Sequence, residues 1–488
     1  MKSISNYKKI RYMIMLFFLF SLIITAGCST GNNDGNSDNE NEAYSISFTD
    51  DSGQEIKMKE PAKRIISLYS AHTENLFALG MDEEIIGVGT SDIYPPKVSE
   101  KDVFDYKSDP EKVIAANPDL VLIRPFIETH SPDFVTALKN AGVNVVSLYP
   151  ESFDEFDRYI STLALVTGTE EKAQEMLDDF HIGIAEIEKE TSKIEPKVNV
   201  YFESTEQDYR TVTPDSMPAR ALKTAGGINI AENVVPISEG SSIAPFGVEK
   251  ILENADIIDV YISQVGAMNA GGSFHSITIR PGFAAIKAVE EGRIFVINEK
   301  IISSPTFRYL KGIEEISRAL YPEVFDDISV LGSEQPISRK NMAELVVKYK
   351  HSPIFVPTSS YFNTERSGHS YGSFSDVDID NPLFDYIETA VASGYMEGRI
   401  SSEKETFCPD ETVTREEFAE ILFMLADLKD NQEKVSINDI SEVKNQRMVE
   451  LVVQNGLMEA SNGLFRPDSQ VTGKEAVEAL EKLSKLDS

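Results

Sequence analysis

Tyrosine, arginine and histidine side chains follow several β-branched runs of this sequence, at positions where strands would end. A tyrosine offers a flat face and a hydroxyl group, which suit a large planar or chelate ligand. An arginine binds carboxylate or catecholate oxygens, often through two parallel hydrogen bonds. A histidine can ligate a metal, although lining a site or hydrogen-bonding is its commoner role. The candidate ligand-binding residues are Tyr69, His72, Tyr94, Tyr106, Arg124, Tyr209, Arg210, His275 and Arg308.

Catalytic and metal-binding motifs do not accompany these residues. The sequence has no GxSxG motif, no Walker-type loop and no paired carboxylates beside a base. Its two cysteines, Cys28 and Cys408, form no CxxC motif and no Cys/His ligand spacing. We therefore expect a binding protein without catalytic residues, without a metal site in the protein itself and without a cofactor.

Residues 44–327 alternate short β-branched runs with helical patterns, which is typical of parallel α/β layers. An internal repeat relates Pro110–Ile123 to Val248–Ile258, and each copy is a helix start, a short helix and a buried strand. A long helical stretch at about 152–193 separates the copies. We expect an α/β fold of two similar lobes, at about 60–150 and about 197–300, joined by this helix and closed by a final helix at 308–325.

These stretches resemble, in content and order, the helix-linked bilobal substrate-binding proteins of ABC importers for ferric siderophores, haem and vitamin B12. The resemblance implies uptake, with the ligand held between the lobes, which close modestly around it. It also implies that a surface glutamate on each lobe docks the permease; by position these are Glu111 and Glu249. The matching stretches are residues 47–68, 67–80, 91–96, 110–123, 138–148, 292–300 and 308–325.

The N-terminal residues 1–28 predict export. Basic residues precede an apolar run, Met13–Thr25, which is shorter than the roughly 20 residues of a spanning helix. Ala26 and Gly27 before Cys28 resemble the lipobox of bacterial lipoproteins, which implies a lipid on Cys28; a plain secretory signal is the alternative. Residues 29–43 are polar and predict a flexible tether between that lipid bilayer anchor and the lobes.

Beyond the lobes, residues 328–372 have a new composition and predict a junction. Two repeat units follow, at 373–430 and 436–488, each with two short helices around a turn. Residues 337–346 have the pattern of the second half of a further, truncated unit. In the 373–430 unit, Thr414 and Glu417 form a capping box that predicts the start of the second helix.

These units resemble S-layer homology repeats, which open with Asp-Val and start a helix with a Thr-Arg-Ala-Glu-like motif. The resemblance implies an all-α domain that binds acidic cell-wall polysaccharide, with Asp376 and Arg415 as the motif residues. Gly473 stands where the last unit would carry the motif arginine. A spacer or a protein-interaction module is the alternative role.

The length and net charge of the chain limit the classes of partner that it can bind. The chain has 488 residues, with 46 Lys and Arg against 80 Asp and Glu, and a net charge of −34 that would repel nucleic acid. We therefore expect a lipid-anchored receptor on the outer face of the cytoplasmic membrane, associated with the wall, that delivers a ferric siderophore or similar metal complex to an ABC permease. The alternatives are a corrinoid or haem receptor, and, from another class, a structural protein of the cell wall or S-layer.

Overall fold

The computed structural model describes residues 44–238, 240–266, 268–269, 274–354, 372–377, 381–401, 404–426, 428–431 and 435–486. The predicted signal peptide, Cys28 and the tether 29–43 lie outside these residues. Among the helices that are described, none is long and apolar enough to cross a membrane.

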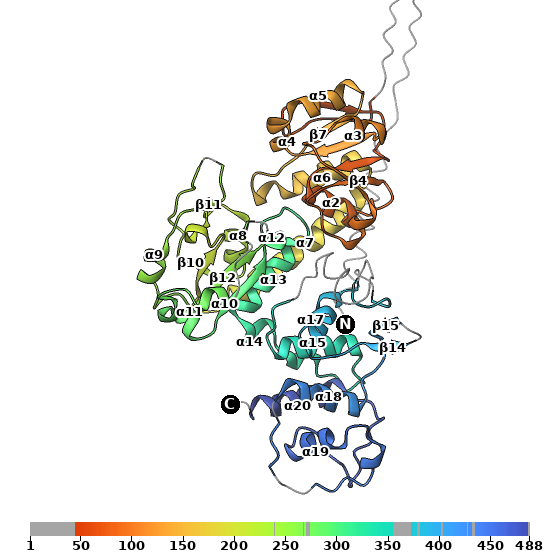
Figure 1. The fold of residues 1–488 in the computed structure, drawn as a ribbon, viewed down its shortest axis with the longest axis vertical. Coiled ribbons are helices and arrows are strands. Elements are labelled where there is room, and N and C mark those ends of the chain that lie inside the picture. Colours follow the sequence, from red (N-terminus) through yellow and green to blue (C-terminus); the bar gives the residue numbers. More distant parts are fainter. Residues whose placement is uncertain are drawn as a thin grey trace, which may run out of the picture. The chain divides into compact units, whose positions relative to one another are not determined.

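The first lobe is built on a parallel sheet of strand order β5-β4-β3-β6-β7 (Figure 1). Every residue of the central strands β3 and β6 is buried, as expected of apolar runs covered on both faces. An antiparallel hairpin, Ile46–Thr49 (β1) with Glu55–Met58 (β2), precedes the sheet. The sheet strands are Ile65–Ser67 (β3), Ile85–Gly89 (β4), Asp102–Phe104 (β5), Leu120–Ile123 (β6) and Asn144–Ser147 (β7).

The helices of this lobe start where the sequence supplies a suitable first residue. A proline occupies the first position of α4 and of α5, where its missing N–H costs nothing. The helices are Ser70–Ala78 (α2), Glu111–Ala115 (α3), Pro125–His130 (α4) and Pro132–Asn140 (α5), with a 3₁₀ turn at Pro96–Glu100 (η1).

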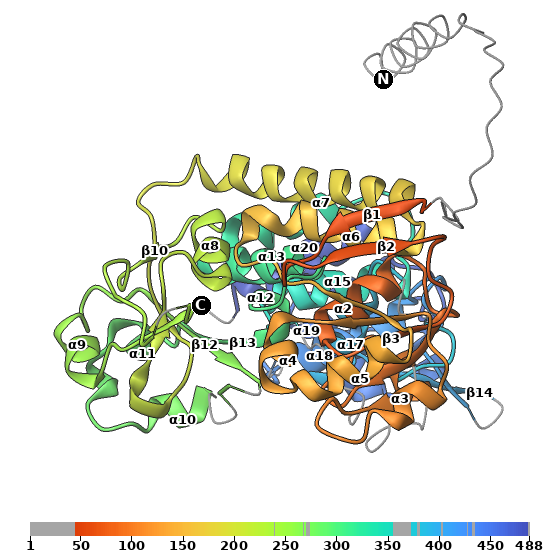
Figure 2. The same cartoon turned by 90° about the horizontal axis from the view of Figure 1, so that it is seen from above.

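The predicted linking helix at about 152–193 is divided. A 3₁₀ turn at Phe153–Glu155 (η2) leads into Phe156–Thr167 (α6), and Glu170–Thr191 (α7) follows after a break. The break occurs at Gly168, whose φ of +71° is a left-handed conformation that favours glycine. Helix α7 contacts α6 on one side and α8 and α13 of the second lobe on the other, so α7 is the element that joins the lobes (Figure 2).

The second lobe repeats the architecture with a parallel sheet of order β10-β8-β12-β13. Its strands are Asn199–Glu203 (β8), Ile228–Asn229 (β10), Val260–Val265 (β12) and Ile294–Asn298 (β13), beside the antiparallel pair Thr211–Val212 (β9) and Ile243–Ala244 (β11). The α-helices are Met217–Thr224 (α8), Val248–Glu253 (α9), Phe274–Thr278 (α10), Lys287–Glu290 (α11), Glu299–Ile302 (α12), Tyr309–Leu320 (α13) and Pro322–Phe325 (α14). Short 3₁₀ turns lie at Gln207–Tyr209 (η3) and Phe283–Ala285 (η4).

One apolar core continues through both lobes. It includes Leu76 of α2, Phe156 of α6, Val200 of β8 and Tyr309 of α13, all essentially buried. A continuous core of this kind opposes large separation of the lobes, because opening would return apolar surface to water.

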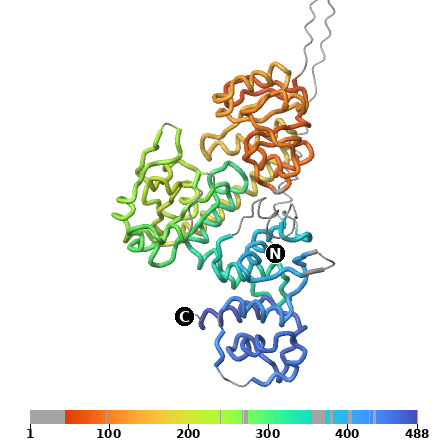
Figure 3. Tube along the Cα trace, in the orientation of Figure 1, coloured from red at the N-terminus to blue at the C-terminus, as the bar shows by residue number. Residues whose placement is uncertain are grey.

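Residues 328–486 form the C-terminal module (Figure 3). It has a separate apolar core that includes Val346, Phe407, Phe418 and Leu480. The elements are Ile328–Leu331 (η5), Arg339–Tyr349 (α15), Phe384–Ala392 (α17), Arg399–Ser401 (β14), Lys404–Thr406 (β15), Arg415–Leu425 (α18), Ile440–Glu442 (η7), Gln446–Gln454 (α19) and Gly473–Ser484 (α20). The α/β class with parallel sheets, followed by a helical C-terminal region, is confirmed.

Helices α15, α18 and α20 are equivalent. Each begins at a serine or threonine N-cap, Ser338, Thr414 or Thr472. The residues before the caps form a closed ring of backbone hydrogen bonds: Ile337 N–H donates to Val471, Val471 to Val413, and Val413 to Ile337, at 2.9–3.0 Å. The truncated unit predicted at 337–346 therefore supplies α15 and completes a three-fold pseudosymmetric ring.

Candidate functional site

The carboxyl ends of parallel strands share one edge of a sheet, where binding sites commonly form. In the first lobe, Tyr69 follows β3, Tyr94 follows β4 and Tyr106 follows β5. Arg124 follows β6 and Tyr149 follows β7. The topology therefore brings side chains that are up to 80 residues apart in sequence, Tyr69 and Tyr149 (149 − 69 = 80), to one edge.

Arg124 lies between aromatic rings at this edge. Its guanidinium carbon is 5.1 Å from the centre of the Tyr69 ring and 4.8 Å from that of Phe126, within cation–π range. The Tyr69 and Tyr149 rings are 6.0 Å apart, and His130 stacks on Phe126 at 3.9 Å. We call Tyr69, Arg124, Phe126, His130 and Tyr149 the lobe 1 aromatic patch.

The aromatic patch remains accessible to a ligand. Phe126 is 42% exposed and Tyr149 is 36% exposed, which is high for aromatic side chains. Tyr69 is more buried, and burial raises the pKa of its hydroxyl, so it stays protonated at neutral pH. Sequence reasoning named Tyr69 and Arg124 but did not select Tyr149 and His130. Tyr149 ends a predicted strand, and His130 is one helical turn after Phe126.

His72 is not at the surface of the site, and the structure removes it from the proposed ligand set. The ring is fully buried; Nδ1 is 2.7 Å from the Tyr159 hydroxyl and Nε2 is 3.0 Å from the Ile123 carbonyl oxygen. Burial lowers the pKa of His72 to about 4, so the ring is neutral at neutral pH. Because both nitrogens have partners inside the core, His72 holds α2 to the sheet and to α6.

Arg308 and Tyr94 connect the lobes and are also unsuited to ligand contact. The Arg308 guanidinium donates two hydrogen bonds to Glu74 of α2, at 2.7 and 2.8 Å, and lies 3.7 Å from the centre of the Tyr94 ring. Its charge is therefore already neutralised by a buried carboxylate. The prediction that Arg308 binds ligand thus gives way to a contact between the second lobe and the first.

Two further hydrogen bonds join the lobes near this point. The Asn75 side-chain amide donates to the Pro305 carbonyl at 2.9 Å, and the Lys300 ammonium donates to the Ser70 hydroxyl at 3.2 Å. Ser70 follows β3 and Lys300 follows β13, so the carboxyl edges of the two sheets meet here. A ligand at either edge would lie beside this meeting point.

Tyr106 lies apart from the aromatic patch. It is half-buried and packs on the apolar cluster that includes Ile66, Val113 and Val121, with the Lys107 ammonium 5.5 Å from its ring. No contact between Tyr106 and the aromatic patch occurs among the described residues.

The edge of the second lobe is organised by Arg280, which sequence reasoning missed. Its guanidinium donates to both carboxylate oxygens of the fully buried Glu203, at 2.5 and 3.2 Å. Glu203, at the end of β8, also accepts hydrogen bonds from Tyr261 at 2.6 Å and Ser263 at 3.0 Å on β12. Both carboxylate oxygens of Glu203 therefore have hydrogen-bond partners. The signal in the sequence was Glu203 itself, because a buried acid at a strand end needs a cation.

Arg280 also positions the loop that carries Tyr209 and Arg210. Its guanidinium carbon is 5.5 Å from the centre of the Tyr209 ring. Asp208 and Tyr209 have φ values of +57° and +47°, a left-handed conformation that is uncommon for residues other than glycine. Arg210 pairs with Asp208 at 2.9 Å, near solvent. The His275 side chain is exposed on α10.

The predicted docking glutamates each lie in the first turn of a short helix. Glu111 opens α3 and Glu249 is the second residue of α9, and both side chains are exposed. A carboxylate in a first turn is favoured by the helix dipole, and its exposure leaves it available to a partner.

In the C-terminal module, the motif residues bind the backbone. Asp376 accepts hydrogen bonds from the Phe407 and Cys408 N–H groups, at 2.8 and 2.7 Å. Arg415 donates to the Phe465 and Glu459 carbonyls, at 2.7 and 2.6 Å, and keeps 16% of its side chain exposed.

Equivalent residues make the same bonds in the neighbouring units. Asp439 accepts from Phe465 and Arg466, as Asp376 does from its own turn. Arg339 of α15 donates to the Phe407 and Glu397 carbonyls, both at 2.7 Å, and its side chain is 5% exposed. The arginine of the motif therefore ties each unit to the turn of the next.

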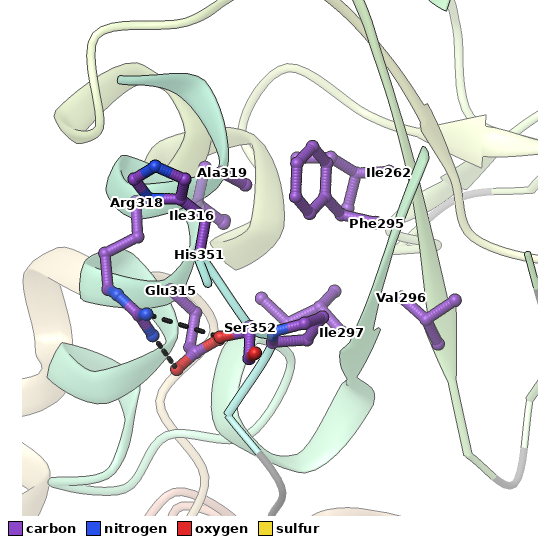
Figure 4. A pocket seen from close by; sticks show the side chains of 11 residues that line it. Ile262, Phe295, Val296, Ile297, Glu315, Ile316, Arg318, Ala319, His351 and Ser352 are labelled. Carbon is purple, nitrogen blue, oxygen red and sulfur yellow. Dashed lines mark hydrogen bonds and ion pairs between the residues drawn. The ribbon is translucent and has the colours of Figure 1, made fainter. Parts of the chain in front are cut away.

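The module also contacts α13 of the second lobe. Lys311 pairs with Asp385, and the Arg318 guanidinium donates to the Ser352 carbonyl at 3.3 Å. A cavity of about 20 Å³, lined in part by Arg318 and Ser352, lies between residues of β12, β13 and α13 and residues 351–353 (Figure 4). It has room for little more than one water molecule and is far smaller than the roughly 300 Å³ or more of a small-molecule site, so it is not the ligand site.

No cluster of three metal-ligating side chains occurs in the part of the chain that the structure describes. The site therefore consists of aromatic faces, hydroxyls and arginines at two adjoining sheet edges. Such an arrangement binds and orients a ligand. Among the described residues of this site, no nucleophilic side chain lies beside a base.

Comparison with known proteins gives two family matches. Residues 65–301 match the family described as "Periplasmic binding protein". Residues 373–419 match the "S-layer homology domain".

Individual relatives cover the first of these regions. The "Uncharacterized ABC transporter substrate-binding lipoprotein YvrC" of Bacillus subtilis is 27% identical over 328 residues, which are 65% of this chain and 100% of the relative. The "Vitamin B12-binding protein" of Vibrio cholerae is 23% identical over 259 residues, 52% of this chain and 88% of the relative. A solved structure of "a possible an iron-binding (periplasmic solute-binding) protein" from Staphylococcus epidermidis aligns at 27% identity with a TM-score of 0.47, covering 54% of this chain and 100% of that one.

Proposed function

The chain joins a domain of the periplasmic binding protein family to an S-layer homology domain, and from this premise we propose that it is the extracytoplasmic substrate-binding protein of an ABC importer. It captures a metal complex, a ferric siderophore or a related chelate, and delivers it to a permease. No reaction is catalysed. The relative from Bacillus subtilis, which this chain spans completely, carries a name of the same class.

One observation carries this proposal. The carboxyl edges of two parallel sheets meet at Ser70 and Lys300, and the exposed aromatic patch with Arg124 stands at that edge. Aromatic faces and a guanidinium suit a large ligand with flat and anionic parts. The proposed ligand-contacting residues are Tyr69, Arg124, Phe126, Tyr149, Tyr209, Arg210 and His275, with Tyr106 near the same edge.

A corrinoid is the second candidate ligand, and haem is the third. The relative from Vibrio cholerae is named a vitamin B12-binding protein and spans the same lobes. A corrinoid has a flat macrocycle that would lie on the aromatic patch. A structural protein that has lost its ligand is the alternative from another class.

Titration with a panel of ligands tests the receptor proposal. The purified chain is titrated by calorimetry with ferric catecholates, ferric hydroxamates, haem and cobalamin. We expect sub-micromolar binding of at least one ligand. If the chain binds no member of the panel, the receptor proposal fails and the structural alternative gains support.

We also propose that the receptor is held at the cell envelope from both ends. A lipid on Cys28 would tether it to the outer face of the cytoplasmic membrane, and the C-terminal module would hold wall polysaccharide. The exposed edge of Arg415 is the proposed contact, and Asp376 shapes the turn of its own unit.

Sedimentation with isolated cell walls tests the wall contact. The full chain is expected to pellet with walls, and Arg415→Gln is expected to pellet less. Lys474→Gln, which removes an exposed charge of the same module, should pellet as the wild type does. A chain that stays in the supernatant would refute wall binding and favour a spacer role.

A further inference from the structure

Three arginines at the two sheet edges are already paired with carboxylates. Arg308 pairs with Glu74 at 2.7 Å, and Arg210 pairs with Asp208 at 2.9 Å. Arg280 pairs with Glu203 at 2.5 Å. Each of these guanidinium groups therefore already has a carboxylate partner.

The Lys300 ammonium is also engaged. It donates to Ser70 at 3.2 Å. Its charge acts on Asp92, a largely buried acid whose pKa burial raises to about 6 and whose charge Lys300 partly offsets.

Arg124 differs from these cations. No carboxylate lies within ion-pair distance of its guanidinium among the residues that the structure describes; its neighbours are the rings of Tyr69 and Phe126. The loop between β12 and α10 adds no charge, because Ala267 and residues 270–273 are alanine, glycine and serine. The edge of the first sheet thus offers a ligand an uncompensated guanidinium beside exposed aromatic faces.

From this charge distribution, and on the premise of the proposed receptor function, we propose that the ligand is a near-neutral metal complex with at most one anionic group, seated on Arg124. Enclosing a charge without a partner costs several kcal/mol, and one guanidinium satisfies one anionic group. A ferric tris-catecholate is strongly anionic, because its deprotonated oxygens outnumber the charges of the ferric ion. A ferric tris-hydroxamate is neutral, and cobalamin carries a single phosphate, so both meet the requirement.

The test compares these probes on the purified full chain. Cobalamin, a ferric tris-hydroxamate and a ferric tris-catecholate are titrated separately by calorimetry at one ionic strength. We expect at least one of the first two to bind, and the tris-catecholate to bind at least about 100-fold more weakly. If cobalamin alone binds, the ligand is a corrinoid; if the hydroxamate complex alone binds, it is a siderophore.

Two variants test the role of the charges. Arg124→Gln should weaken binding of cobalamin, through its single phosphate, about tenfold or more, whereas Lys172→Gln, an equal charge change on the exposed face of α7, should not. Asp208→Asn frees Arg210 and should strengthen tris-catecholate binding several-fold. Asparagine tolerates the φ of +57° at this position, so the loop should persist.

The outcomes separate this inference from the receptor function. Preferential binding of the tris-catecholate would overturn the inference and leave the receptor function standing. Equal cobalamin affinities of Arg124→Gln and Lys172→Gln would overturn the assignment of Arg124 as the anion contact. Binding of none of these three probes would overturn the inference, and if haem, titrated in the same way, also fails to bind, the receptor proposal falls with it.

Discussion

Histidine and arginine side chains acquire opposite roles here according to their neighbours. His72 is three residues after Tyr69, at the start of α2, yet its ring lies in the core with both nitrogens hydrogen-bonded. Arg308 is paired with Glu74, whereas Arg124 faces only aromatic rings. Residue type and position after a strand therefore predict a candidate, and the partners decide whether it is available.

Burial of His72 predicts a pH dependence of stability. The folded protein holds the pKa near 4, below the ordinary value of 6.5, so the unfolded chain binds a proton more readily between these values. This group therefore contributes stability that is fully present above pH 6.5 and is lost as the pH falls towards 4. The loss amounts to roughly 3 kcal/mol at most.

Urea unfolding of the wild type and of His72→Gln across this pH range measures the effect. The wild type should lose stability on acidification more steeply than the variant, which lacks the titrating ring. Asp92 and Glu315 have raised pKa values and act in the opposite sense, but both proteins share them. His181→Gln, at an exposed histidine, should behave as the wild type does. Parallel slopes for the wild type and His72→Gln would contradict the prediction.

At the scale of elements, the equivalence of α15, α18 and α20 explains the missing motif arginine. The Gly473 N–H donates to the Gln335 carbonyl at 3.0 Å, as Arg339 donates to Glu411 and Arg415 to Ser469. Residues 331–335, which lead into the module, pack directly against Gly473. A Cβ added at Gly473 would lie 2.4 Å from the Leu331 carbonyl oxygen. A larger side chain cannot fit, so the last unit has no arginine at this position.

Gly473→Ala tests that close contact. The added Cβ would clash with a backbone carbonyl, which cannot avoid it by a change of rotamer as a side chain could. We therefore expect the free energy of unfolding of the C-terminal module to fall by about 2 kcal/mol. Thermal unfolding followed by circular dichroism measures the change. Lys474→Ala removes only an exposed ion pair with Glu334 and should cost less than about 1 kcal/mol. Equal melting temperatures of Gly473→Ala and the wild type would contradict the prediction and show that residues 331–335 can move to make room for a Cβ.

At the scale of the whole molecule, the exposed Glu111 and Glu249 lie on different lobes, and we propose them as two separated contacts for a permease. Changing both Glu111 and Glu249 to arginine should abolish ligand-dependent uptake in cells, because like charges would meet at the proposed contacts. Ligand affinity of the purified protein should not change, because neither residue lies on the aromatic patch.

A control variant tests whether a charge reversal elsewhere on the surface also affects uptake. Glu171→Arg makes the same charge change at an exposed residue of α7 and should leave uptake unaltered. Normal uptake by the Glu111→Arg, Glu249→Arg double variant would remove these residues from the docking surface.

Much of this protein follows from its sequence. The apolar runs, the repeated helix-strand unit and the proline and threonine helix starts determine the two parallel sheets, the linking helix and the repeat module, because they depend on local periodicity and capping. The same patterns predicted that the truncated unit at 337–346 is helical. They also placed Tyr69 and Arg124 after strands, which parallel topology brings to one edge.

Only the tertiary structure decided which charges are free. The pairing of Arg280 with Glu203, of Arg308 with Glu74 and of the module with α13 joins residues far apart in the chain. Such pairings depend on distance in space, on burial and on which carboxylate reaches a given guanidinium, and no local pattern records them. For this reason the sequence indicated Arg124, Arg210 and Arg308 as ligand contacts, whereas the structure shows that Arg210 and Arg308 are paired with carboxylates and that Arg124 faces aromatic rings.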